Sequence, residues 1–174
     1  MNKKESYVLS VSERPGCYRH ISVPCSMTLE ELSEVILDIF EFDNDHGHAF
    51  FMDNRAWSSG DSYYSKETAG DGMNIEESEF METMLRDLGV PADVMKKMNR
   101  ADRRSSDVTM GELGLEKGRK FLYIFDFGTE WTFNCRVLRV EDGENDEITV
   151  LRSKGDPPDQ YGSDFEYEDE EYEE

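Results

Sequence analysis

The stretch Phe121-Leu-Tyr-Ile-Phe-Asp-Phe-Gly-Thr-Glu-Trp131 contains the strongest β-strand signal in the sequence. Every second residue from Phe121 to Phe127 is aromatic, which is the period expected of a strand with one buried face. The segment 128–130 is suited to turning the chain, and apolar residues alternate again from Trp131 to Val140. We therefore expect an antiparallel hairpin across this turn.

A second hairpin and a helix are predicted near the N-terminus. Residues 7–11 and 17–23 alternate in the same way, and Pro15-Gly16 lies between them. Thr28 and Glu31 have the spacing of a capping box, and apolar residues then recur at three- and four-residue steps as far as Phe40. Residues 46–52 favour a strand that returns to the same sheet. The opening order is therefore expected to be β-β-α-β.

Two more helices are expected in the centre of the chain, from Ile75 to Leu88 and from Pro91 to about Asn99. Beyond the aromatic hairpin, a turn at Asp142-Gly143 leads to a last strand at residues 148–151. These patterns predict an α+β fold: a mixed or antiparallel sheet with a β-β-α-β opening, central helices packed on one face and a C-terminal antiparallel meander. We expect one domain over residues 1–154 and a tail over residues 155–174.

Acidic residues dominate the charge of the chain. Its 174 residues include 40 Asp and Glu against 19 Lys and Arg, a net charge of −21. The tail contains ten of these acids and no Lys or Arg, so we expect it to be disordered. Such an excess disfavours direct binding to nucleic acid and docking on anionic membranes.

One short stretch reverses this charge with five basic residues: Lys96, Lys97, Arg100, Arg103 and Arg104. It is either a docking patch for a partner or a segment that pairs with acids of the same chain. Both interpretations are open at this level.

Several features indicate the compartment. The first residues lack the apolar stretch of a secretory signal, and no run reaches the roughly 20 apolar residues that span a bilayer. Cys17, Cys25 and Cys135 are odd in number and have no metal-ligand spacing, as expected of reduced thiols. We expect a soluble, cytoplasmic protein.

The motifs for catalysis are weak. Asp126-Phe127-Gly128 is similar to the metal-binding triplet of kinases, but the glycine-rich loop and the HRD segment are absent. His46 and His48 would share one strand face, and with Asp43 and Asp45 they could form a metal site; the alternative is two hydrogen-bonded structural histidines. No nucleophile elbow or dinucleotide fingerprint occurs. We predict no catalytic residue, cofactor or metal ligand.

Four motifs in a fixed order carry a family resemblance. They are the helix segment 28–40, His46-Gly-His-Ala-Phe50, the stretch 121–131 and Gly155-Asp-Pro-Pro-Asp159 with Gly162. Together they resemble the plasmid pRiA4b ORF-3-like family over most of residues 7–162. The family pattern has a Leu where this chain has Gly47, an Asp at Thr129 and frequently a His at Phe133. The resemblance implies a fold and no established biochemical activity.

Three functions follow as hypotheses. The first is a non-catalytic protein-interaction module with an unknown protein partner. The second is a metal-dependent or hydrolase-like enzyme that uses His46 and His48. The third is an acidic mimic of nucleic acid that binds a basic DNA-binding protein through the tail. The candidate cleft for a ligand or partner comprises His46, His48, Asp126, Gly128 and Trp131; the alternative for the segment from Asp126 to Trp131 is a hairpin with a buried aromatic anchor.

Overall fold

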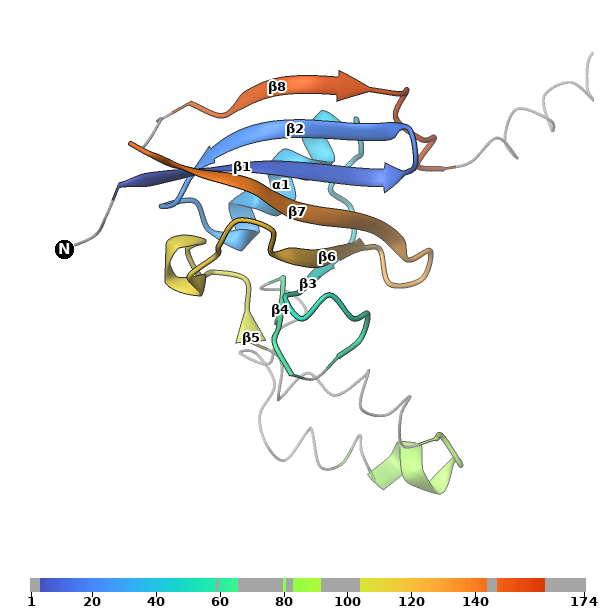
Figure 1. Cartoon of the computed structure of the whole chain (residues 1–174). Coiled ribbons are helices and arrows are strands. Elements are labelled where there is room, and N and C mark those ends of the chain that lie inside the picture. The colour runs from blue at the N-terminus through green and yellow to red at the C-terminus, as the bar shows by residue number, and fades with distance from the viewer. Residues whose placement is uncertain are drawn as a thin grey trace, which may run out of the picture.

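The computed structural model describes residues 4–58, 60–65, 80, 83–91, 104–143 and 147–161. Eight strands in these ranges form one sheet, in the order β5-β4-β3-β6-β7-β1-β2-β8 (Figure 1). Neighbouring strands are antiparallel, except that β4 and β5 are parallel. The helix α1 lies behind the sheet in Figure 1 and packs against one of its faces.

The elements follow one another along the chain with these bounds: β1 Glu5–Arg14, β2 Cys17–Pro24, α1 Leu29–Ile39, β3 His48–Phe51, β4 Ser62–Tyr64, β5 Arg104–Ser105, the short 3-10 helix η2 Gly111–Leu113, β6 Lys120–Phe125, β7 Trp131–Asp142 and β8 Thr149–Lys154.

The expected N-terminal hairpin is formed by β1 and β2, with Leu9 opposite Ile21. Gly16 has φ of 83° in the turn between them, a conformation that glycine adopts without steric cost. Leu9 and Val11 are fully buried on the side of the sheet that faces α1. β1 also pairs with β7, so this strand is central in the sheet and hydrogen-bonded along both edges.

Helix α1 begins where the capping pattern predicts. The Thr28 hydroxyl accepts a hydrogen bond from the backbone N–H of Glu31 at 3.1 Å, and Glu30 and Glu31 place negative charge in the first turn. The helix buries Leu29, Leu32 and Ile36 against the sheet. At 25 cal/mol per Å² of apolar surface, each of these side chains contributes roughly 1.5–3 kcal/mol to folding.

A smaller apolar cluster lies on the other face of the sheet, over β3, β4 and β6 only. It contains Ala49, Phe51, Tyr64 and Ile124, with Trp57 packed against it. Among the described residues, no helix covers the same face of β1, β2, β7 and β8. We call this part of the sheet the open face.

The expectation of a fold with several central helices was wrong. Strands account for 42% of the described residues and helices for 16%, with one helix of seven residues or more. Residues 83–87 are helical, but Phe80, Met84 and Leu88 are 69%, 39% and 73% exposed and pack on no face of the sheet. The rest of the two expected helices lies outside the described residues. In the described structure, α1 alone fills the helix layer of the core.

The expected C-terminal meander was also wrong. β6 and β7 form the predicted hairpin, but β7 has β6 on one side and β1 on the other. Both edges of β7 are therefore occupied, and β8 instead crosses the sheet to pair with β2. This places β8 at one edge of the sheet.

The chain after β8 runs back along the fold. The side chain of Arg19 donates hydrogen bonds to the carbonyls of Lys154 and Gly155, at 2.9 and 3.0 Å. Gln160 and Tyr161 reach the loop that precedes β3. Residues 162–174 of the expected tail lie outside the described residues, so its disorder stays a prediction.

No helix in the described ranges has both the length and the apolar character needed to cross a membrane. The three cysteines are free, and Cys17 and Cys135 are buried. Burial raises the pKa of the Cys135 thiol, which keeps it protonated and unreactive.

Candidate functional site

Three of the five predicted cleft residues, His46, Asp126 and Gly128, meet at one end of β3 and β6. His48 is opposite Phe125 in the antiparallel register, so the residues before β3 lie beside those after β6. The backbone N–H of Asp126 donates to the Gly47 carbonyl at 3.0 Å. As a result His46 Nε2 lies 3.7 Å from Asp126 Oδ2. The structure therefore brings the histidine motif and the Asp126-Phe-Gly motif together.

Asp126 also shapes the turn between β6 and β7. Its Oδ1 accepts hydrogen bonds from the backbone N–H groups of Gly128 and Thr129, at 3.1 and 3.3 Å. Positive φ angles in this turn occur at Asp126, 61°, and Glu130, 56°, rather than at Gly128. The aspartate side chain compensates for this backbone conformation by bonding locally, as Asp does in many turns.

A third motif, which sequence reasoning did not place here, completes the cluster. The Tyr161 hydroxyl lies 2.6 Å from Asp45 Oδ2 and 3.1 Å from Asp43 Oδ2. Gln160 exchanges two hydrogen bonds with the backbone of Asp43, at 2.7 and 3.0 Å. The segment that closes the family pattern therefore docks on the loop that carries His46. We call Asp43, Asp45, His46, Asp126 and Tyr161 the junction cluster.

The charges of the junction cluster depend on each other. Asp45 accepts a hydrogen bond from His46 Nδ1 at 2.7 Å; this bond, with a smaller effect from Asp126, raises the pKa of His46 above its ordinary 6.5. The pKa of Asp45 is lowered, first by the Tyr161 hydroxyl and then by His46. Hydrogen bonds to the carboxylates of Asp45 and Asp43 raise the pKa of Tyr161, and Asp45 has the larger effect. The cluster therefore favours a protonated His46 beside ionised carboxylates.

This arrangement predicts the titration of His46. In an NMR titration its ring is expected to titrate above pH 6.5, and Asp45→Asn is expected to move the pKa back toward 6.5 because the strongest partner is lost. The attraction between protonated His46 and the Asp45 carboxylate is fully present below pH 6.5 and is lost as the pH rises through the raised pKa of His46. Asp43→Asn is the matched control, since Asp43 bonds Tyr161 and not His46. An unchanged titration in Asp45→Asn would contradict the assignment.

His48 lies in a different environment from His46. β3 begins at His48, so the two histidines do not share a strand face as the alternation predicted. His48 is 3% exposed; its ring contacts Phe50 and Tyr123. Its Nε2 lies 3.0 Å from the Ser106 hydroxyl and 3.5 Å from Glu30 Oε2. Burial lowers the pKa of His48 to about 4, so the ring is neutral at pH 7.

The His48 network has the wrong connectivity for a catalytic triad. The Ser106 hydroxyl donates to Glu30 and accepts from His48 Nε2, whereas a triad needs the histidine between the serine and the carboxylate. Ser106 is also fully buried. Within the described part of the chain, no group of three His, Cys, Asp or Glu side chains could hold a metal ion.

Trp131 acts as an aromatic anchor on the core side of the sheet. It is opposite Phe125 in the β6–β7 register and contacts the Phe42 ring edge-on at 5.0 Å. Phe125 itself lies between Trp131 and His48 in the sheet. The five predicted residues therefore occupy three places: His46, Asp126 and Gly128 lie at the turn, and His48 and Trp131 each lie in a packed position of their own.

Only one residue of the predicted basic patch lies within the described ranges. Arg104 in β5 forms an ion pair with Asp61 at 3.0 Å, and its guanidinium lies 4.2 Å from the centre of the Tyr63 ring. It is therefore engaged by its own chain. Lys96, Lys97, Arg100 and Arg103 lie outside the described residues.

A basic row that was missing from the sequence analysis, made of Arg152, His20, Arg136 and Lys120, crosses the open face and extends onto the adjoining strand β6. Cross-strand pairs connect Arg152 of β8 to His20 of β2, His20 to Ser10 of β1, Ser10 to Arg136 of β7, and Arg136 to Lys120 of β6. At about 4.8 Å per strand the basic row spans roughly 19 Å. Its members come from four distant segments, so only strand pairing reveals it.

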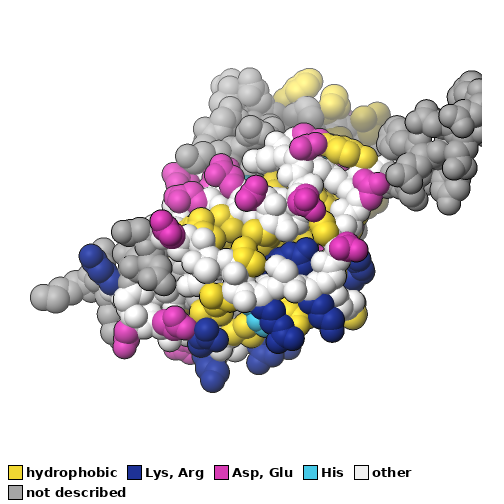
Figure 2. Space-filling model, turned by 90° about the horizontal axis from the view of Figure 1, so that it is seen from above, with side chains coloured by type: hydrophobic (Ala, Val, Ile, Leu, Met, Phe, Trp, Pro, Cys, Tyr) yellow, Lys and Arg dark blue, Asp and Glu magenta, His cyan; other side chains and the backbone are white. Residues whose placement is uncertain are grey.

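The cations of the basic row have no acidic partner among the described residues. Arg136, Arg152 and Lys120 are exposed and form no ion pair with the rest of the described chain, whereas Arg139 beside them pairs with Glu141 at 2.5 Å. Burial lowers the pKa of His20, and the charges of Arg152 and Arg139 lower it further. Figure 2 shows dark blue side chains gathered along one side of the molecule, around a cyan side chain, while most of the acids lie toward the other side.

Comparison with known proteins adds a family and a fold. A family model described as plasmid pRiA4b ORF-3-like protein matches residues 7–170. Among curated proteins there is no match. The crystal structure of a protein of unknown function from Methanosarcina mazei Go1 is similar, with a TM-score of 0.58 and 18% sequence identity over 96% of this chain and 79% of that chain. At this identity the likeness shows a shared fold alone.

Proposed function

The chain belongs to the plasmid pRiA4b ORF-3-like family, and we propose that it is a non-catalytic protein-interaction module that binds an acidic segment of another protein on the basic row. The observation that carries this proposal is a set of three exposed cations that form no ion pair with a described acid, on a chain whose net charge is −21. Because the acids repel one another, a cation close to them would stabilise the fold. The cations of the basic row lie apart from the described acids, so their charge is available to a partner.

The position of the basic row on the sheet suits it to bind a partner. The open face presents an ordered set of strands, so Arg152, Arg136 and Lys120 are fixed relative to one another by backbone pairing. Binding at these fixed positions therefore costs less conformational entropy than binding at flexible loops would. Arg side chains also bind carboxylates in a bidentate way, which favours an acidic protein segment.

The chemistry of the open face favours protein over single-stranded nucleic acid. Proteins that bind single strands stack the bases on free aromatic rings. The aromatic ring on the row side, Tyr18, already stacks on His20 at 4.9 Å, and the Arg152 guanidinium lies 5.7 Å from its centre. The neighbouring outward positions on β1 and β7 are Ser12 and Asn134. Among the described residues of the open face, base stacking therefore lacks a free aromatic ring.

The other two hypotheses have less support. The enzyme hypothesis relied on His46 and His48 acting together, and these histidines occupy separate environments. The nucleic-acid mimic depends on residues of the tail beyond Tyr161, which lie outside the described residues. A cytoplasmic location belongs to the present proposal and is supported by the three free cysteines.

Binding to a labelled oligoglutamate peptide tests the proposal. We expect Arg136→Glu with Arg152→Glu to weaken binding by roughly 10-fold or more, because two attractive charges become repulsive. Binding of the unmodified chain should also weaken with added salt. Fluorescence anisotropy measures both effects.

The matched control carries the same change of charge elsewhere. Arg55→Glu with Arg86→Glu reverses two exposed cations that lie on none of the strands of the basic row and should leave the affinity within about 2-fold. Equal losses in the two double variants would mean that net charge alone governs binding, which contradicts the proposal. Tighter binding of an oligothymidylate than of oligoglutamate would also contradict it.

A further inference from the structure

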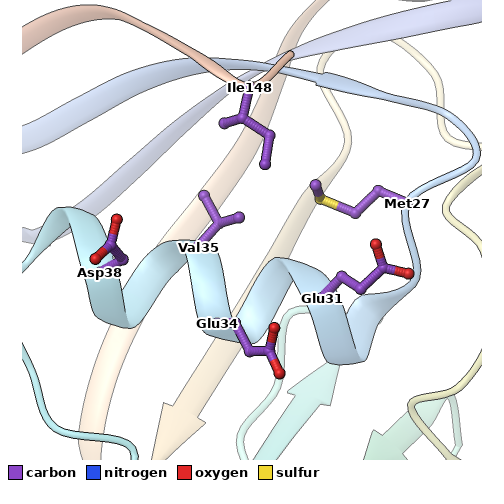
Figure 3. A pocket seen from close by; sticks show the side chains of 6 residues that line it. All are labelled: Met27, Glu31, Glu34, Val35, Asp38 and Ile148. Atoms are coloured by element: carbon purple, nitrogen blue, oxygen red, sulfur yellow. The ribbon is translucent and has the colours of Figure 1, made fainter. Parts of the chain in front are cut away.

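A second surface lies on the opposite side of the sheet, where the edge strand β8 meets α1. A groove of about 410 Å³ is lined there by Met27, Glu31, Glu34, Val35, Asp38 and Ile148. Figure 3 shows Ile148, next to the start of β8, pointing toward Val35 of α1, with Met27 and Glu31 at one end of the groove and Asp38 at the other. The groove therefore has an apolar floor, and three carboxylates of α1 lie along it.

The strand beside the groove has a free edge. β8 pairs with β2 on one side and has no neighbour on the other in the described sheet. Its first residues, Thr149-Val-Leu151, carry no charge, and Ile148, Val150 and Leu151 are 44%, 46% and 48% exposed. Edge strands are commonly protected by charge or by a covering segment, because unpaired backbone groups invite another strand. This half of β8 has neither in the described structure.

The acids along the groove select the occupant. Glu31, Glu34 and Asp38 lie at three- and four-residue steps on α1 and are exposed. None of them forms an ion pair with a described residue, and basic residues are absent from the last turn of the helix. An incoming strand that carries Lys or Arg beside apolar side chains would satisfy both the carboxylates and the apolar floor.

We propose that the free edge of β8 and the adjoining α1 groove bind an extended, Lys- or Arg-bearing segment of a different protein by strand addition. Backbone hydrogen bonds to β8 supply affinity, and the groove reads every second side chain of the added strand. Two copies of this chain joined through β8 would bring the acidic sides of two α1 helices together, and like charges oppose that pairing. A basic segment meets no such repulsion.

This site is independent of the basic row, since it faces α1 and attracts the opposite charge. The probe is a short labelled peptide of alternating valine and lysine, and the reference is the same peptide with glutamate in place of lysine. The intact chain is expected to bind the valine-lysine peptide and not the reference. Amides of residues 149–151 are expected to gain protection from hydrogen exchange when it binds.

Variants of the groove separate the effect of its acids on peptide binding from the effect of its apolar floor. Glu34→Gln with Asp38→Asn is expected to weaken binding of the valine-lysine peptide about 5-fold, which corresponds to two exposed ion pairs. Glu31 is kept because its backbone is part of the α1 cap. The matched control, Glu116→Gln with Asp142→Asn, removes two exposed acids elsewhere and should leave the affinity unchanged. Ile148→Ser should weaken binding without altering its dependence on salt.

Three results would overturn the proposal. The first is that the Glu34 and Asp38 double variant binds the valine-lysine peptide as tightly as the unmodified chain does. The second is that the unmodified chain binds the valine-glutamate reference as tightly as the valine-lysine peptide, and the third is concentration-dependent dimerisation through β8 in analytical ultracentrifugation. Oligoglutamate binding by the groove variants should stay unchanged, so that a failure here is distinguishable from a failure of the basic row.

Discussion

Lowering the pH from about 6.5 to about 4 is expected to destabilise the fold by roughly 3 kcal/mol through His48 alone. The unfolded chain takes up a proton on this histidine near pH 6.5, whereas the folded chain resists it until about pH 4 because the ring is buried. The unfolded state therefore binds more protons throughout this window. Stability is fully present above pH 6.5 and falls as the pH drops through the window.

Urea unfolding at several pH values measures this effect. His48→Gln keeps an N–H donor for Ser106 but cannot take up a proton, so its free energy of unfolding should fall by roughly 3 kcal/mol less than that of the unmodified chain over the same window. Glu30 Oε2 lies 3.5 Å from the ring, and Glu30→Gln serves as the control for the charge of this neighbour. Parallel losses in the unmodified chain and in His48→Gln would contradict a neutral, buried His48.

Gly155→Ala is the second substitution with a large expected effect, a loss of roughly 2–5 kcal/mol in the free energy of unfolding. Gly155 has φ of +80°, which costs any other L-residue conformational energy. An added Cβ would also lie 2.8 Å from the Cys17 Cα and closer still to the Gly16 carbonyl oxygen. The backbone of the first hairpin would have to move, and β8 ends at this point.

Gly118→Ala is the matched control for that prediction. Gly118 has φ of +90° with nothing within 4 Å of an added Cβ, so only the conformational cost of about 1–2 kcal/mol applies. Urea unfolding of the two variants separates strain from collision. Equal losses would mean that the close approach of Gly155 to the β1–β2 turn contributes nothing.

The longer strands could be predicted from the sequence because their signal is local, whereas β4 and β5 were not predicted. Apolar side chains alternate through most of β1, β2, β6 and β7, and the Thr28 cap marks the start of α1. Strand order could not be predicted in the same way, since pairing joins segments far apart along the chain. The meander failed because β1, the first strand, occupies the edge of β7 that β8 was expected to take. The prediction of central helices packed on the sheet was wrong because an apolar stripe shows that a helix is amphipathic but does not show which surface covers the stripe.

The candidate site could be predicted in part for the same reason. The short distance between His46 and Asp126 follows from two motifs on neighbouring strands, and the sequence contained both. The separation of His48 from His46 depends on where β3 begins, a boundary that the alternation does not define. The contact of Tyr161 with Asp45 and the basic row both need the tertiary fold, because their members lie in distant segments.

The position of an acidic probe on the sheet tests the central proposal most directly. An isotope-labelled sample titrated with oligoglutamate is expected to show its largest backbone amide shifts at His20, Arg136 and Arg152, in three strands of the open face. The shifts should disappear in Arg136→Glu with Arg152→Glu. Largest shifts at the junction cluster around His46 and Asp126, or along α1, would contradict the assignment of the basic row as the binding surface.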